Sequence, residues 1–131
     1  MFINTEELLV AYLTPLLTAD QVSTELPNEP PLPFILVTRI AATDDKVTEL
    51  AMADVEFFAN SRDSANDLAR QGHSRMLSLS PKTPVVTPSG TVWVDWVRTD
   101  QGPAWQDYAD EDLDRYVARY EIASRINSQP L

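Results

Sequence analysis

The residues that most often carry chemistry are scarce in this chain, which has one histidine, His73, and no cysteine. Metal sites and nucleophilic catalysis bring several His, Cys, Asp or Glu side chains together. His73 has neither a second histidine nor a thiol to act with. The lack of cysteine also removes disulfides and is typical of a protein that folds in a reducing cytoplasm. We therefore expect His73 to be an ordinary residue on the surface of a helix.

One short segment without basic residues is crowded with carboxylates: Asp107, Asp110, Glu111, Asp112 and Asp114. Carboxylate oxygens suit hard cations, so a small metal-dependent hydrolase is one interpretation. An EF-hand loop, however, needs ligands at fixed alternate positions and a glycine in the middle, and this segment has neither. A solvated acidic loop before the last element is the better interpretation.

Two further patterns fail to predict a catalytic site. Asp54 and Glu56 share the outer face of one expected strand, but acid–base catalysis needs two carboxyls in contrasting surroundings. The three glycines, Gly72, Gly90 and Gly102, are scattered, so there is no glycine-rich phosphate loop, and no G-x-S-x-G elbow occurs. The sequence therefore predicts that the protein is not an enzyme and uses no cofactor.

The net charge and the chain length exclude further classes of protein. The 131 residues include 20 acidic and 10 basic side chains, a formal charge of -10. Proteins that hold nucleic acid need a basic surface, so specific DNA binding is excluded. The apolar stretch at residues 8–17 is interrupted by Thr14 and Pro15 and follows two glutamates, so we expect neither a signal peptide nor a membrane span. The length indicates a single domain over residues 1–131.

Two helices are expected. The first begins at Asn4 or Thr5, has two glutamates in its first turn, and ends or kinks near Pro15. The second is capped by Ser61 or Asp63. Each carries an apolar stripe at helical spacing, made in the first helix by Leu8, Leu9, Tyr12, Leu13 and Leu16 and in the second by Ala65, Leu68, Ala69 and Met76.

Alternation of apolar and polar residues predicts the strands. We expect residues 34–41 to form one strand with Phe34, Leu36 and Ile40 on one face. Residues 53–57 are expected to form a second strand that pairs with it, with Ala53, Val55 and Phe57 inward. Residues 91–98 form a third, with Val92, Val94 and Trp96 on one face, and residues 21–25 a short edge strand. Residues 115–126 fit helical and strand spacing equally, and their tyrosine and β-branched content favours a strand.

Proline, glycine and charged residues predict the conformation of the connecting segments. Residues 26–33 hold four prolines and must be extended and irregular, and residues 79–90 form a loop that ends in a turn. Residues 43–50 are polar and lack glycine, which indicates a projecting loop.

These elements predict an α+β fold: a mostly antiparallel sheet of four to five strands with two helices packed on one face. The expected core comprises Leu9, Leu13, Leu36, Val55, Phe57, Leu68, Val94 and Tyr120.

The order of these pieces resembles the tail terminator proteins of bacteriophages with long non-contractile tails. The resemblance rests on the initial helix, the 34–41 strand, the second helix and four sequence pieces at residues 53–57, 92–94, 102–105 and 115–122. Its most specific feature is the Gly-Pro-x-Trp turn at residues 102–105, followed about ten residues later by an alternating aromatic strand.

The resemblance implies a virion protein of the tail and neck region, assembled in the cytoplasm of the bacterial host. Such a protein forms a hexameric ring that caps the tail tube, stops polymerisation of the major tail tube protein and contacts the head-tail connector protein. DNA passes through the ring without specific binding, and no membrane is involved. A head-completion or connector subunit of the neck is the alternative within the same class.

Two sets of residues are candidates for these roles. Interface candidates are the exposed loop and turn residues Asp44, Asp45, Lys46, Gly102, Pro103 and Trp105, although Trp105 is equally suited to fold back over the preceding strand. Candidates for acidic charge in the channel, where they would keep DNA from the wall, are Asp54, Glu56, Asp107, Asp110, Glu111 and Asp112.

Overall fold

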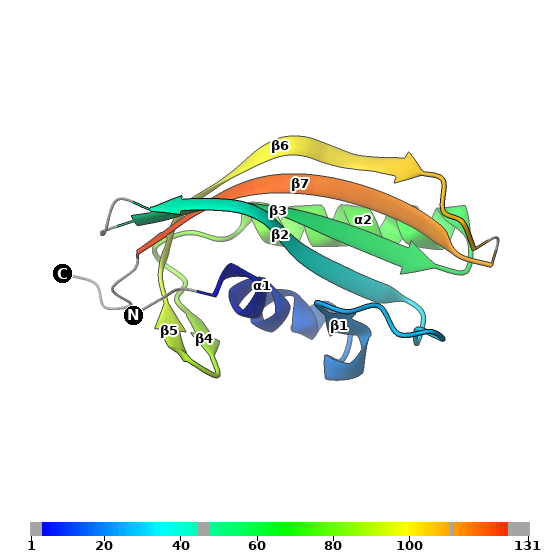
Figure 1. Cartoon of the computed structure of the whole chain (residues 1–131), viewed down its shortest axis with the longest axis horizontal. Helices are drawn as coiled ribbons and strands as arrows, with labels where there is room; N and C mark the ends of the chain where they lie inside the picture. The colour runs from blue at the N-terminus through cyan, green and yellow to red at the C-terminus, as the bar shows by residue number, and fades with distance from the viewer. Residues whose placement is uncertain (1–3, 45–47, 111, 126–131) are drawn as a thin grey trace.

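The computed structural model describes residues 4–44, 48–110 and 112–125, and these form an α+β fold (Figure 1). The helices are α1 (Thr5–Leu13) and α2 (Arg62–Leu77), with short 3-10 turns η1 (Thr14–Leu16) and η2 (Ala19–Gln21). The strands are β1 (Val22–Ser23), β2 (Phe34–Asp44), β3 (Thr48–Ala59), β4 (Val85–Thr87), β5 (Gly90–Val92), β6 (Val94–Gln106) and β7 (Asp114–Arg125).

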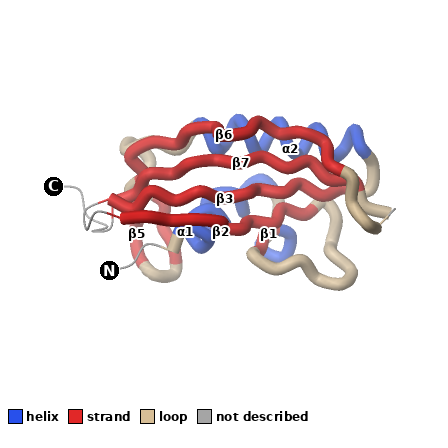
Figure 2. The backbone as a smooth tube through the Cα atoms, turned by 45° about the horizontal axis from the view of Figure 1, so that its top comes forward, coloured by secondary structure: helices blue, strands red, loops and turns tan. Residues whose placement is uncertain are grey.

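The main sheet has the strand order β1-β2-β3-β7-β6. Strand β1 is parallel to β2, and all the other pairs are antiparallel. Helices α1 and α2 lie against the same face of this sheet, and no described helix covers the opposite face (Figure 2). The layered fold inferred from the sequence is therefore confirmed, with β4 and β5 forming a separate two-stranded sheet beside α1.

Both helices begin where the sequence predicts. Asn4 caps α1 by accepting a hydrogen bond from the Glu7 N–H at 3.0 Å, and Ser61 caps α2 through the Ser64 N–H at 3.2 Å. The predicted apolar stripes are buried, apart from Leu16, which is half-buried in η1. No helix among the described residues is long and apolar enough to cross a membrane.

Helix α2 approaches the sheet closely at Gly72. A Cβ atom added to this glycine would lie 2.2 Å from Cε1 of Phe57 on β3. The ring of Phe57 therefore occupies the space that a side chain at position 72 would need, and this accounts for a glycine in the middle of a helix, where it weakens helix formation.

Strand β3 follows the predicted alternation, since Ala53, Val55 and Phe57 are fully buried. Seven of the eight expected core residues are buried, namely Leu9, Leu13, Val55, Phe57, Leu68, Val94 and Tyr120. The exception is Leu36, which lies on β2 and is half-buried.

The inner face of β2 was therefore predicted wrongly. Ile35 and Val37 point into the core, whereas Ile40 is 41% exposed. Positions 34–37 are all apolar, so alternation does not specify which face is buried. A register shift between Arg39 and Ala41 further changes the faces along the strand.

The prediction of a projecting loop over residues 43–50 is also wrong for most of its length. Thr43 pairs with Leu50 and Asp44 with Glu49, so β2 and β3 extend to the end of a long hairpin. Pairing of β3 with β7 continues along the same stretch, and this support from a third strand is not visible in the local sequence. Asp45 and Lys46 lie outside the described residues.

The strand predicted over residues 91–98 is divided at Trp93. Strand β5 pairs with β4, which the sequence analysis had treated as loop, and a turn with Gly90 at φ 132° joins them. Strand β6 then enters the main sheet with a register shift between Val94 and Trp96. This bulge turns Trp96 outward, where it is 38% exposed, and lets Val97 pack against the core.

The ambiguous C-terminal segment is a strand, as predicted. Strand β7 lies between β3 and β6 and pairs with both along its length. Its inward residues Ala118, Tyr120 and Ile122 are fully buried.

Candidate interaction surface

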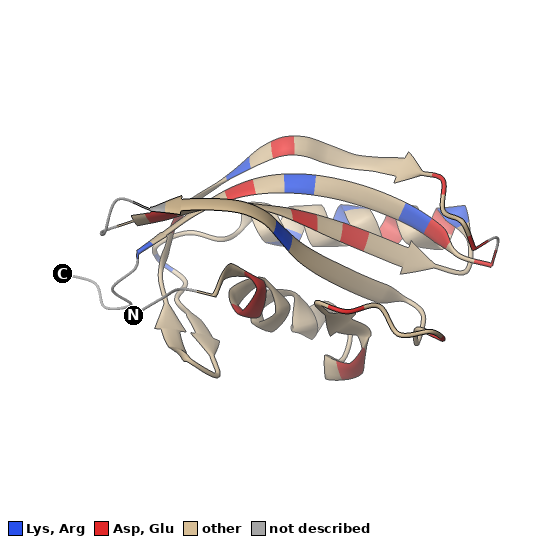
Figure 3. Ribbon diagram, viewed as in Figure 1, with Lys and Arg blue, Asp and Glu red and all other residues tan. Residues whose placement is uncertain are grey.

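Charged residues recur along β3, β7 and β6 (Figure 3), and those on the sheet face opposite the helices pair across strands. Arg119 on β7 lies directly across from Asp54 on β3 and donates to its two carboxylate oxygens at 2.8 and 3.3 Å. Arg115 binds Glu56 at 2.9 Å. The hydrogen bond and charge of Asp54 raise the pKa of the Arg119 guanidinium above its usual value.

Two more pairs extend the series along β7. Glu121 lies 4.0 Å from Arg98 on β6, and Arg125 donates to Asp95 at 2.9 Å. We call the four pairs of Asp54, Glu56, Asp95 and Glu121 with arginines the ion-pair rows. Asp54 and Glu56 share an outer face, as their spacing predicts, but their partners lie 65 and 59 residues away and have no local signal in the sequence.

At one end of the same face the side chains are mainly apolar. The strand register aligns Trp96, Ala123, Leu50 and Thr43 across β6, β7, β3 and β2, and aligns Arg98, Glu121, Met52 and Ala41 in the next row. Trp96 is 38% and Leu50 36% exposed, and the Arg98 guanidinium lies 4.7 Å from the centre of the Trp96 indole ring. This apolar end is an exposed surface of a kind common at protein interfaces.

The segment containing Gly102, Pro103 and Trp105 was predicted as a turn and instead belongs to β6. Edge strands tolerate proline, and a register shift between Gln101 and Ala104 accommodates Gly102 and Pro103. Trp105 is 37% exposed, with the guanidinium of Arg62 at 4.6 Å from its ring centre. The indole of Trp105 is therefore accessible to a partner, and its role at an interface stays a prediction.

The acidic run lies in the connection between β6 and β7. Asp107, Asp110 and Asp112 are exposed, and Glu111 lies outside the described residues. The Asp110 carboxylate accepts a hydrogen bond from the Asp112 N–H at 3.0 Å, as in an Asx turn. Within the described part of the chain, no three His, Asp or Glu residues are grouped so that they could hold a metal ion.

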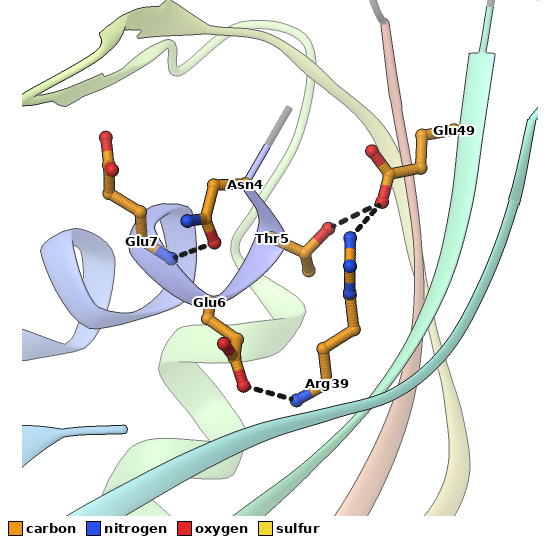
Figure 4. A network of polar contacts seen from close by, with 6 residues as sticks. All are labelled: Asn4, Thr5, Glu6, Glu7, Arg39 and Glu49. Atoms are coloured by element: carbon orange, nitrogen blue, oxygen red, sulfur yellow. Dashed lines mark hydrogen bonds and ion pairs between the residues drawn. The ribbon is translucent and has the colours of Figure 1, made fainter. Parts of the chain in front are cut away.

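Near the end of the β2–β3 hairpin, a polar network joins the start of α1 to the sheet (Figure 4). Glu49 is buried, and one of its carboxylate oxygens accepts hydrogen bonds from Thr5 Oγ1 at 3.3 Å and Arg39 Nη1 at 3.1 Å. Glu6 accepts a bond from the Arg39 N–H at 3.0 Å. The sequence analysis treated Glu49 as a loop residue, and its spacing from Thr5 and Arg39 gives no local signal of this network.

A second helix–sheet contact involves His73, which is half-buried and not the surface residue that was expected. Its Nδ1 lies 2.7 Å from the hydroxyl of Tyr120 on β7. Burial raises the pKa of the Tyr120 phenol well above its usual value, so the hydroxyl stays protonated and can donate this bond. The pair therefore joins α2 to the sheet.

The carboxylate of Glu7 holds the turn between β4 and β5 against α1. It accepts hydrogen bonds from the Ser89 N–H at 2.8 Å and the Ser89 hydroxyl at 3.2 Å. These bonds, the one from the backbone first, lower the pKa of Glu7.

Comparison with known proteins shows a likeness in structure but none in sequence. No family model matches the sequence, and no curated protein matches it. The structure is similar to a chain in the virion of a native gene transfer agent particle, with a TM-score of 0.58 and 11% sequence identity, over 88% of this chain and 85% of that chain. At this identity the likeness shows a shared fold, which this chain therefore has in common with a protein of a gene transfer agent virion.

Proposed function

We propose that this chain is a structural subunit of a phage-like virion that forms a ring of six copies at the head-proximal end of the tail tube. The ring ends polymerisation of the tube protein and joins the tail to the head connector. The observation that carries the proposal is the fold shared along most of both chains with a protein of a gene transfer agent virion. The order of sequence pieces that resembles tail terminators supports the finer assignment.

The surfaces of the chain are suited to assembly. One face of the sheet is packed by helices. The opposite face presents the ion-pair rows and the apolar end, and the β6–β7 connection covers part of it where Tyr108 contacts Phe58 and Arg115. A subunit of a ring needs contact surfaces for neighbours and for the components above and below it. The exposed Trp105 and the end of the β2–β3 hairpin are the proposed contacts with the tube or the connector.

The ion pairs reduce the set of acidic residues that we expect to repel DNA in the channel. Asp54 and Glu56 are each paired with an arginine at about 3 Å, so each pair is close to neutral. Its electric field is therefore weak at distances beyond the Debye length of ~8 Å. The acidic connection between β6 and β7 has exposed carboxylates and would supply most of the repulsion. In this proposal, DNA passes without specific binding.

The proposal is tested by adding the purified chain to polymerising tube protein of the same particle and measuring tube length and ends by electron microscopy. We expect shorter tubes that carry a ring at one end. A control uses Val86→Ala, an exposed position on the separate β4–β5 sheet, which should act like the wild type.

The competing neck role gives the opposite result. A head-completion or connector subunit would bind DNA-filled heads that lack tails and would leave tube length unchanged. That outcome would refute the terminator assignment while keeping a virion role.

A further inference from the structure

The outer edge of β2 is exposed toward its C-terminal end. Strand β1 pairs with Ile35 and Leu36, the Arg39 N–H donates to Glu6 of α1, and no described strand lies beside residues 40–44 on that side (Figure 2). Residues 40–43 on this edge are exposed and contain neither charge nor proline. Edge strands in soluble proteins are commonly protected by charges, prolines or bulges, and an apolar edge pairs readily with another strand. The register shift next to Ile40 is the main irregularity here.

The opposite edge of the sheet is β6, which has no described strand on its outer side either. Three register shifts interrupt β6, and they leave a regular stretch from Trp96 to Thr99. Pro103 cannot donate a backbone hydrogen bond, so pairing with another strand cannot extend across it. The β6 edge therefore offers a short, defined segment for pairing.

Strand direction makes the two edges complementary. Because β2, β3, β7 and β6 alternate in direction, the two edge strands run in opposite directions. A second copy placed beside the first in the same orientation would therefore bring its β6 antiparallel to β2. The helices of both copies would lie on the same side of the continued sheet.

We infer that neighbouring copies of this chain assemble head to tail by pairing the β2 edge at residues 40–43 with the 96–99 segment of β6. This inference rests on the proposed ring and identifies its subunit contact. A head-to-tail contact repeats around a closed ring and leaves neither edge exposed.

The side chains at the two edges match in this arrangement. Trp96 lies in the same cross-strand row as Thr43, and Arg98 in the same row as Ala41. Continuing the rows into the next copy places the exposed indole of Trp96 beside Thr43, at one end of the uncharged 40–43 segment. A tryptophan against apolar neighbours is typical of the residues that anchor interfaces.

Engineered cysteines test the contact, because the chain has no cysteine of its own. In the full-length double variant Ala41→Cys/Arg98→Cys, the two positions within one chain are separated by β3 and β7, roughly 14 Å, which is too far for a disulfide. Mild oxidation should therefore link different copies, giving a ladder from dimer to about hexamer on a non-reducing gel. Thr43→Cys/Arg98→Cys tests a register shifted by two residues, and Val86→Cys/Arg98→Cys is the control that should give no ladder.

Each result has a distinct meaning when the mass of the unlinked assembly is measured by light scattering. A ladder beyond the dimer supports the inference. Products that stop at the dimer overturn it, since they indicate a symmetric contact. A ring of defined mass without crosslinks at either register also overturns it but leaves the proposed function standing. A chain that stays monomeric at every concentration and on tube ends overturns both.

A charge on the β2 edge provides a second measurement. Ile40→Lys should weaken self-association at least about tenfold, because the lysine would have to be buried against the next copy. The thermal midpoint of the isolated chain should barely change, as Ile40 is exposed. Val86→Lys is the matched control, and equal association of the two variants would refute the edge contact.

Discussion

Substituting Gly72 by alanine should lower the stability of the folded protein, whereas the same change in an exposed helix normally raises it. In an exposed helix interior, alanine is more favourable than glycine by ~1 kcal/mol. Here the added Cβ would lie 2.2 Å from Cε1 and 2.6 Å from Cζ of Phe57, far inside the ordinary contact distance of 3.4 Å or more. Phe57 is fully buried on a central strand, so its ring cannot move aside without displacing the core.

The expected magnitude follows from these opposing effects. Overpacking of a core costs ~1 to 3 kcal/mol or more, and the short contact places Gly72→Ala at the upper end of that range. After subtracting the gain in helix propensity, we expect a net loss of ~2 kcal/mol in the free energy of unfolding. For a chain of this length, that loss corresponds to a fall of about 8 °C in the thermal midpoint.

Urea unfolding followed by circular dichroism measures the change, and two variants sharpen it. Gly102→Ala is the matched control: an added Cβ there has nothing within 4 Å, so stability should stay within about 0.5 kcal/mol of the wild type or rise slightly. In a Phe57→Leu background the conflicting ring atoms are absent, and Gly72→Ala should become neutral or stabilising. If Gly72→Ala behaves like Gly102→Ala in the wild-type background, the close packing of α2 on β3 is refuted.

Three further experiments test the core, the helix–sheet contact and the ion-pair rows. Val55→Ala should lower the free energy of unfolding by ~2 to 4 kcal/mol, because it leaves a cavity at a fully buried position. A loss under about 1 kcal/mol in urea unfolding would contradict the assigned strand register. Tyr120→Phe should cost ~1 kcal/mol at pH 7 through loss of the bond to His73. Burial raises the pKa of the Tyr120 phenol, so the stability that this group contributes is present below about pH 10 and is lost as pH rises further. When the free energy of unfolding is measured from about pH 8 to 11.5, the wild type should show this decline and Tyr120→Phe should not. A double-mutant cycle of Glu56→Gln and Arg115→Met should give a coupling of ~1 kcal/mol, and a coupling of zero would mean that the pair is only incidental.

The helices and the central strands could be predicted from the sequence because their signals are local. A capping side chain and an apolar stripe fix where α1 and α2 begin and which face they bury, and both are read within a few residues of Asn4 and Ser61. Strict alternation did the same for β3, and tyrosine content decided in favour of a strand for β7. The placement of Asp54 and Glu56 on one outer face followed from the same alternation.

The candidate surface could be predicted only in part. The sequence located exposed Trp105 and the acidic connection, but it gave Trp105 to a turn, since Gly-Pro commonly ends regular structure. The edge position of β6 permits the proline, and a strand's place at the edge of a sheet depends on residues far along the chain.

By itself, then, the sequence determined the class of fold, where the two helices begin and which face of β3 is buried, because these depend on spacings of a few residues. Tertiary structure alone decided the inner face of β2, since an uninterrupted apolar run suits either face until α1 packs against one of them. It also decided that Trp96 is exposed, because a bulge sets the direction of the side chain. The partners of Glu49, Asp54 and Tyr120 were likewise set by which strands and helices pack together, and that non-local pairing leaves no signal in the spacing of residues along the chain.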